Sequence, residues 1–306
     1  MKKFIYVFVT MVICSSTLRA AEPSSVVLPF TRLGYDAISL GMGGTSVLNT
    51  SNSAFATFQN AALMSYQEGS FDSGIGYQLF QPSGVGSHNI SVGVAGKVID
   101  RIGIGVGVAY NMHRPYSMTG DSGDDLGKFT PSDMQVNLGL SCKIIEYLSV
   151  GVNLKYLNTT MAKDSKMNAF SSDIFLMTSV KGFKAALGVS SLGTKVKSGE
   201  NFYNLPTSLT IGLGYGNNFG QHGVEVDLDM DYYFHKAFSA AVGLAYGWND
   251  MVFVRAGYRY GEKTVVPSFA SVGLGGKFSG FKIDLAYLFA SKAFNNTVAV
   301  TLGYTF

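Results

Sequence analysis

The last ten residues, 297–306, read TVAVTLGYTF and alternate between two kinds of side chain. Successive side chains of an extended strand point to opposite faces. One face here is small or hydroxylated, and the other is apolar and aromatic: Val298, Val300, Leu302, Tyr304 and Phe306. This pattern is typical of a strand in a transmembrane β-barrel. We therefore expect Tyr304 and Phe306 to form the C-terminal barrel signal for the barrel assembly machinery.

The same alternation recurs from Ser70 onward, in segments of about ten residues separated by turns or loops. Clear examples span 102–110, 134–142, 150–156, 209–215, 242–246 and 281–289. Fourteen such segments can be counted between residues 70 and 306. The sequence thus predicts an all-β fold, a transmembrane antiparallel β-barrel of about fourteen strands, whose closure leaves no unpaired edge.

The links between these segments alternate in length. Short links lie near Asp100, Glu146, Gly182, Asn217, Asn249 and Gly280, and longer ones include 111–132, 158–168, 191–206 and 261–267. The link around His235 is the exception, because it is short where a long one is due. Outer-membrane barrels have short periplasmic turns and longer external loops. An even strand count then places both barrel ends on the periplasmic side.

Composition favours strands over helices in the membrane. Of the 306 residues, 47% are hydrophobic and 14% charged, whereas about a quarter is charged in soluble proteins. After the first twenty residues, no apolar run approaches the roughly 20 residues of a membrane-spanning helix. Large apolar side chains should face lipid, with tyrosines near segment ends in the interfacial girdles: Tyr110, Tyr156, Tyr215, Tyr246, Tyr258, Tyr287 and Tyr304.

Residues 1–20 have the parts of a secretory signal peptide: Lys2 and Lys3, an apolar stretch over 4–14, and a small residue, Ala20, at the cleavage site. Cleavage after Ala20 reduces the 23 basic residues to 20, equal to the 20 acidic ones. No nucleic-acid partner is therefore expected. We expect the mature protein in the bacterial outer membrane, surrounded by lipid and lipopolysaccharide. Its one remaining cysteine, Cys142, cannot form an internal disulfide.

Residues 21–69 lack the strand pattern and are expected to form an N-terminal plug inside the barrel. Leu40-Gly41-Met42-Gly43-Gly44 precedes a Ser/Thr/Asn-rich stretch, and 54–63 suits a short helix and loops. Glycines alternate over 103–107 in a predicted strand. They favour room for the plug, with a lateral opening toward lipid as the alternative.

These residues resemble the FadL-like superfamily of outer-membrane proteins, including its PorV/PorQ branch found in Bacteroidetes. The family pattern Ala-x-x-Leu-Gly-Met-Gly-Gly matches residues 37–44, and its Asn-Pro-Ala matches Asn60-Ala61-Ala62 without the proline. The resemblance implies fourteen strands and an N-terminal hatch, with a plug motif of Leu40, Gly41, Met42, Gly43, Gly44 and Asn60. The short chain looks closer to the PorV/PorQ-like relatives.

One predicted strand carries four acids on its inner face: Glu225, Asp227, Asp229 and Asp231. Two strands later, Arg255 and Arg259 also face inward, and the strand between presents only small side chains. Strands lie about 4.8 Å apart, so each arginine would cross roughly 10 Å to reach the acids. The favoured interpretation is that this lumen charge network neutralises charge inside the barrel. The alternative is that it lines a polar channel or holds the plug.

No enzyme, metal or cofactor is predicted. The histidines, at 88, 113, 222 and 235, lack metal-ligand spacing, and no nucleophile and base converge. Asp121, Asp124 and Asp125 fit a solvated external loop, with a divalent-cation or lipopolysaccharide contact as the alternative. Two functions remain open. One is a passive channel for hydrophobic or small solutes, with a hydrophobic small-molecule ligand. The alternative is a PorV/PorQ-like accessory component of a type IX secretion or envelope complex, whose loops bind the secretion partner.

Overall fold

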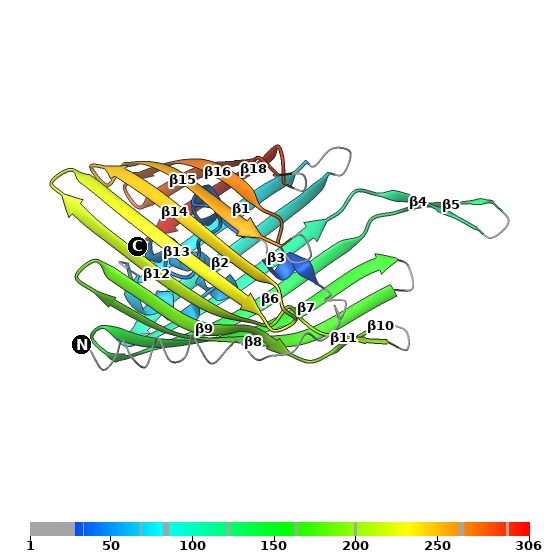
Figure 1. The fold of residues 1–306 in the computed structure, drawn as a ribbon, viewed down its shortest axis with the longest axis horizontal. Helices are drawn as coiled ribbons and strands as arrows, with labels where there is room; N and C mark the ends of the chain where they lie inside the picture. Colours follow the sequence, from blue (N-terminus) through cyan, green and yellow to red (C-terminus); the bar gives the residue numbers. More distant parts are fainter. Residues whose placement is uncertain are drawn as a thin grey trace.

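A computed structural model describes residues 28–32, 34–67, 69–81, 86–120, 123–162, 165–198, 201–262, 266–291 and 294–306. The predicted signal peptide and the first residues of the predicted plug lie outside this range. Fourteen antiparallel strands close into a barrel in the order β1-β18-β17-β16-β15-β14-β13-β12-β9-β8-β7-β6-β3-β2, with β2 paired to β1 (Figure 1). The predicted fold class is therefore confirmed.

The barrel strands match the alternating segments of the sequence. Their bounds are β1 (Phe71–Phe80), β2 (Ser87–Ile99), β3 (Ile102–Met112), β6 (Ser132–Ile145), β7 (Leu148–Ala162), β8 (Ser165–Val180), β9 (Phe183–Gly193), β12 (Ser208–Phe219), β13 (His222–Tyr233), β14 (Phe238–Trp248), β15 (Val252–Gly261), β16 (Phe269–Phe278), β17 (Phe281–Phe289) and β18 (Thr297–Thr305).

The two ends of the barrel differ as the link lengths predicted. Tight turns join the strands at one end, where left-handed backbone at Lys181-Gly182 and Ser279-Gly280 suits the twist of a hairpin. Longer connections lie at the other end and contain two small hairpins, β4–β5 (Tyr116–Thr119 and Asp125–Phe129) and β10–β11 (Val196–Ser198 and Asn201–Tyr203). Figure 1 shows β4–β5 projecting beyond the barrel, away from the C-terminus.

Two connections bear on the predicted rhythm. The link around His235 is short, since β13 ends at Tyr233 and β14 begins at Phe238. The long link expected over 158–168 was wrong, because β7 continues to Ala162 and β8 resumes at Ser165. Paired strands extend into this connection, as Thr160 still faces Lys166.

The outer surface of the barrel is apolar. Outward side chains such as Val106, Leu138 and Leu244 are exposed, and the tyrosines near strand ends are exposed or half-buried. Hydrocarbon tolerates this composition where water would not. Cys142 is a free, exposed thiol on this surface. No helix among the described residues is long and apolar enough to cross a membrane.

The lumen contains the N-terminal region, which forms η2 (Pro29–Arg32), α2 (Ala37–Gly41), η3 (Thr50–Phe58) and η4 (Ala61–Tyr66). Asp36, Asn49 and Asn60 cap the last three, each accepting a backbone N–H. α2 lies against β15–β18, η3 against β1–β3 and β6, and η4 against β2, β3 and β6–β8. The hydrophobic core therefore lies between the plug and the inner wall of the barrel.

Glycines on the wall let the plug backbone lie directly against the strands. An added Cβ would come within 2.1 Å of Ala54 O at Gly93 and within 2.1 Å of Ala62 N at Gly151. At the predicted glycine run 103–107, it would meet Met64, Thr57 or Phe58 of the plug. β3 is also paired along its length with β2 and β6. These glycines thus provide room for the plug, and nothing there supports the alternative of a lateral opening.

Candidate functional site

The four acids of β13 lie on the inner face, as the alternation predicted. Asp227, Asp229 and Asp231 are 1%, 2% and 7% exposed, whereas the side chain of Glu225 is 26% exposed. The strands on either side supply small residues opposite them, such as Gly214 on β12 and Gly243 on β14. The acids therefore have space above them that plug residues and basic side chains enter.

The two arginines of β15 extend in opposite directions along the wall. Arg259 crosses β14 over Ala241 and approaches Asp231, with Nη1 3.4 Å from Oδ2. The pairing predicted for Arg255 was wrong, because its Nη1 bonds Asp284 Oδ1 on β17 at 2.7 Å. The physical reason lies on β16, where an added Cβ at Gly275 would lie 2.6 Å from Arg255 Nη1. Glycine there opens a path in the other direction.

A lysine that the sequence analysis missed replaces Arg255 at the acids. Lys184 of β9 reaches across β12 to pair with Glu225, and its Nζ lies 3.7 Å from Asp227 Oδ1. Its inward position follows from the parity that puts Ala186 and Gly188 inside. That parity was the available signal. Two further pairs line the lumen, Lys155 with Asp173 and Lys282 with Asp72.

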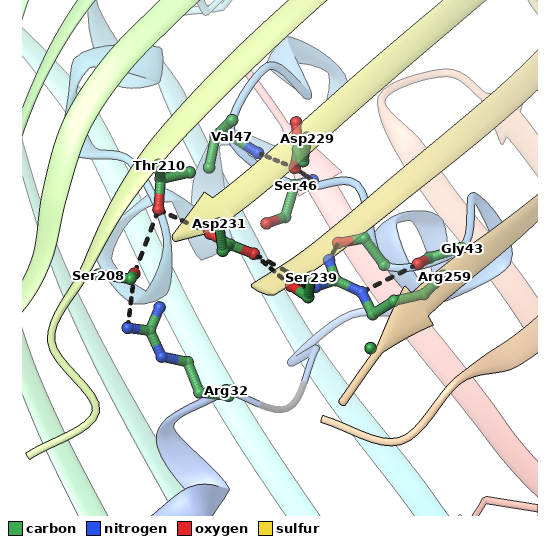
Figure 2. Close-up of polar contacts among 12 residues, drawn as sticks. Arg32, Gly43, Ser46, Val47, Ser208, Thr210, Asp229, Asp231, Ser239 and Arg259 are labelled. Atoms are coloured by element: carbon green, nitrogen blue, oxygen red, sulfur yellow. Dashed lines mark hydrogen bonds and ion pairs between the residues drawn. The ribbon is translucent and has the colours of Figure 1, made fainter. Parts of the chain in front are cut away.

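The charged wall also holds the plug (Figure 2). Asp229 Oδ2 accepts the backbone N–H of Ser46 at 2.7 Å and that of Val47 at 3.2 Å. Arg259 donates from Nε to Gly43 O at 3.3 Å and from Nη2 to Gly44 O at 2.7 Å. The acid and the arginine predicted for a charge network are therefore contacts of the plug as well.

The plug motif has a local explanation in each part. Leu40 packs in the cluster with Phe269 and Leu288. Gly41 lies where a Cβ would be 3.1 Å from Gly273 Cα, while Gly43 and Gly44 have φ of 73° and 82°, which favour glycine. Met42 caps α2.

Asn60 connects the two halves of the plug. Its side chain accepts the N–H of Ala62 at 2.9 Å and donates to Val47 O at 2.8 Å.

Two further plug side chains bond the wall. Farther toward the long loops, Arg32 donates to Pro206 O and, at 2.8 Å, to Ser208 Oγ. Its guanidinium lies 4.8 Å from the centre of the Tyr233 ring. Burial raises the pKa of Tyr35 above its ordinary range, so its hydroxyl stays protonated and donates to Gln135 Oε1 at 2.7 Å.

Cavities lie along this wall, one at the short-turn end and two among plug residues. A polar cavity of about 580 Å³ opens at the short-turn end and is lined by Ser51, Gly216, Asn218, Glu225, Ala245 and Phe253, among others. A second cavity, of about 70 Å³, lies toward the long loops and touches Gly44, Ser46, Asp229, Asp231 and Arg259. A third, of about 20 Å³, shares Gly44 and Arg259 and is otherwise mostly apolar, with Phe80, Phe269 and Phe294.

The remaining predicted residues lie elsewhere. Phe306 is 70% exposed at the barrel end and packs edge-on against Phe71 and Tyr304. Asp124 is exposed in the β4–β5 connection and Asp125 is exposed at the start of β5, while Asp121 lies outside the described residues. Across the described ranges, no group of three or more His, Cys, Asp or Glu side chains is arranged to hold a metal ion.

Comparisons with known proteins identify the fold but no sequence relative. No family model matches the chain, and no curated protein does. The Pseudomonas putida toluene transporter TodX superposes with a TM-score of 0.63 at 14% identity, covering 92% of this chain and 99% of TodX. The monoaromatic hydrocarbon channel CymD gives 0.61 at 13%, covering 90% and 98%. A Pseudomonas aeruginosa FadL homologue gives 0.53 at 11%, covering 89% and 98%.

These identities are low enough that the likeness concerns the fold alone. None of the three structures supports the narrower PorV/PorQ-like resemblance, an origin in Bacteroidetes or a role in secretion. The chain shares the barrel architecture of FadL-family outer-membrane channels.

Proposed function

We propose that the protein is a passive channel of the bacterial outer membrane for hydrophobic or small solutes, closed in this structure by its N-terminal plug. One observation carries the proposal: the lumen holds one cavity at the short-turn end and a second among plug residues farther along the same wall, and plug residues occupy the space between the two. A barrel packed solely for stability has no need of a polar cavity of about 580 Å³ that opens at its mouth.

Two features support this function. The apolar outer surface and the different barrel ends suit an outer-membrane protein, which agrees with the predicted signal peptide. TodX and CymD, which share the fold, are described as a toluene transporter and a monoaromatic hydrocarbon channel. Passage down a gradient also needs no catalytic group. Outer-membrane lipid and lipopolysaccharide would surround such a channel.

A reversible lock on the plug tests the proposal. An added Cβ at Gly41 would lie 3.7 Å from Ala286 Cβ. The Cβ atoms of two disulfide-bonded cysteines lie roughly 3.5–4.5 Å apart, so a disulfide fits there. We expect Gly41→Cys/Ala286→Cys, in a Cys142→Ala background, to form this bond. In proteoliposomes, uptake of a fluorescent fatty acid and of small polar solutes should be low when the protein is oxidised and rise after reduction.

The Cys142→Ala protein is the control, because reductant should leave its uptake unchanged. If neither solute enters with either protein, oxidised or reduced, the channel function is wrong. Recovery of a stoichiometric envelope partner from native membranes would then favour the accessory role, for which no described feature speaks at present.

A further inference from the structure

The wall formed by β13, β14 and β15 differs from the rest of the lumen, because a short polar stretch of the plug covers it. This stretch, Gly43-Gly44-Thr45-Ser46, is named the gate segment. This inference rests on the proposed channel function. We propose that solutes pass along this wall, that the gate segment, together with Met42, separates the two cavities on it, and that the open route selects small cations over anions and over hydrophobic solutes.

The gate segment lies between two cavities along this wall. The cavity at the short-turn end reaches Glu225 on β13 and Ala245 on β14. The cavity toward the long loops reaches Asp229 on the same β13 and Arg259 on β15. Between these levels lie Gly243 and Gly257, which face each other across β14 and β15.

The gate segment and Met42 cover those two glycines. A Cβ at Gly243 would lie 2.6 Å from Thr45 Oγ1 and 2.6 Å from Met42 O, and one at Gly257 would lie 2.2 Å from Gly43 N. Displacing the segment together with the backbone of Met42 would therefore leave bare glycine backbone, and the two cavities would join.

The gate segment is held by polar contacts, while its neighbours are held by apolar ones. Besides Asp229 and Arg259, its wall contacts include Ser271 Oγ, which accepts the Gly43 N–H at 2.9 Å. Met42, Val47 and Leu48 on either side are at most 6% exposed, and the last two belong to the main core cluster. Water can replace polar contacts at small net cost, whereas exposing apolar anchors is costly. Two glycines with positive φ give the segment backbone freedom between fixed ends.

The charge along the route determines which solutes it suits. The second cavity is lined by three acids and three bases, so its charges balance: Asp173, Asp229 and Asp231 with Arg32, Lys155 and Arg259. The cavity at the mouth is lined by Glu225 and Asp250 and by no described lysine or arginine, so the excess of acid lies there. Oδ1 of Asp229 is buried and has no hydrogen-bond partner among the described residues, next to the second cavity. The cavity at the mouth adds Asn217, Asn218, Gln221 and Asn249. Acidic side chains lining a pore favour cations, and amide-lined walls do not attract hydrocarbon.

Conductance in planar lipid bilayers under a KCl gradient tests both parts. Arg259→Gln removes the donors to Gly43 O and Gly44 O, and we expect at least about tenfold more frequent opening, the factor equivalent to about 1.4 kcal/mol. Arg255→Gln is the matched control, because it makes the same change on the same strand without touching the gate segment. It should open as rarely as the wild type. Heat-modifiable electrophoretic mobility will show that each variant is folded.

Selectivity is read from the reversal potential of the opened protein. We expect preference for K⁺ over Cl⁻, reduced toward equality by adding Glu225→Gln/Asp227→Asn, which leaves the gate contacts in place. An anion-selective or unselective Arg259→Gln pore, or equal opening of the two arginine variants, would overturn the inference. Fatty-acid uptake without any ion conductance would overturn it too, yet would leave the channel function intact.

Discussion

The two halves of the lumen hold the plug by different physical means. Against β1–β3 and β6–β8, η3 and η4 bury Phe55, Leu63 and Met64 completely, and their backbone rests on wall glycines. Against β13–β15, the plug offers Gly-Gly-Thr-Ser to Asp229 and Arg259, with cavities on both sides. One wall therefore contributes stability by packing, while the other keeps contacts that water can replace.

The largest effect is expected on the packed side, from Phe55→Ala. Phe55 is fully buried, and its ring fills the space left by Gly74, where a Cβ would lie 2.6 Å from Cε2. Truncating a buried phenylalanine typically costs about 3–5 kcal/mol. Thermal unfolding in detergent should show a large fall in melting temperature. An unchanged melting temperature would contradict the view that this half supplies the core.

Gly151→Ala should have the next largest effect on stability. Its Cβ would lie 2.1 Å from the backbone nitrogen of Ala62, which no side-chain rotation relieves. Overpacking of this kind costs about 1–3 kcal/mol. Gly86→Ala is the control, since nothing lies within 4 Å of its added Cβ. Equal melting temperatures for the two variants would argue against close contact between plug and wall.

On the polar side, Asp229→Asn should lower stability by less and alter flux as well. Asparagine keeps an acceptor for Ser46 N–H but loses the charge. Hydrogen bonds to charged groups contribute about 1.5–3 kcal/mol and neutral ones about 0.5–1.5 kcal/mol, so the expected loss is the difference, about 1 kcal/mol. If Asp229→Asn lowers the melting temperature and leaves solute flux unchanged, the predicted charge network has a structural role only. If the melting temperature is unchanged and solute flux rises, the network has no structural role. Paired melting and liposome-flux measurements distinguish these results.

The smallest effect is expected outside the lumen. Lys277 Nζ lies 2.8 Å from Asp250 Oδ2, but the side chain of Asp250 is 73% exposed. Exposed ion pairs contribute about 0–1 kcal/mol. Asp250→Asn should therefore leave the melting temperature nearly unchanged. A fall as large as that of Asp229→Asn would remove the distinction between buried and exposed charges on which the comparison of the walls depends.

Much of the candidate site could be predicted from residue parity. Alternation alone placed Asp229 and Arg259 inside and Val226 and Leu228 outside, because strand side chains change face at each residue. The same rule would have included Lys184. The ion-pair partner of Arg255 could not be predicted, since an arginine on β15 can extend toward the acids of β13 or toward Asp284 on β17. Glycine at position 275 on β16 leaves room for the second direction.

The barrel, the strand number, the face of each strand residue and the difference between the two ends follow from the amino-acid sequence, since these features depend on local alternation and link length. Only the tertiary structure decided which charges pair, where the plug backbone touches the wall and where the lumen stays hollow. Those features join residues far apart in the chain, and their geometry depends on the space that several strands and the plug leave together.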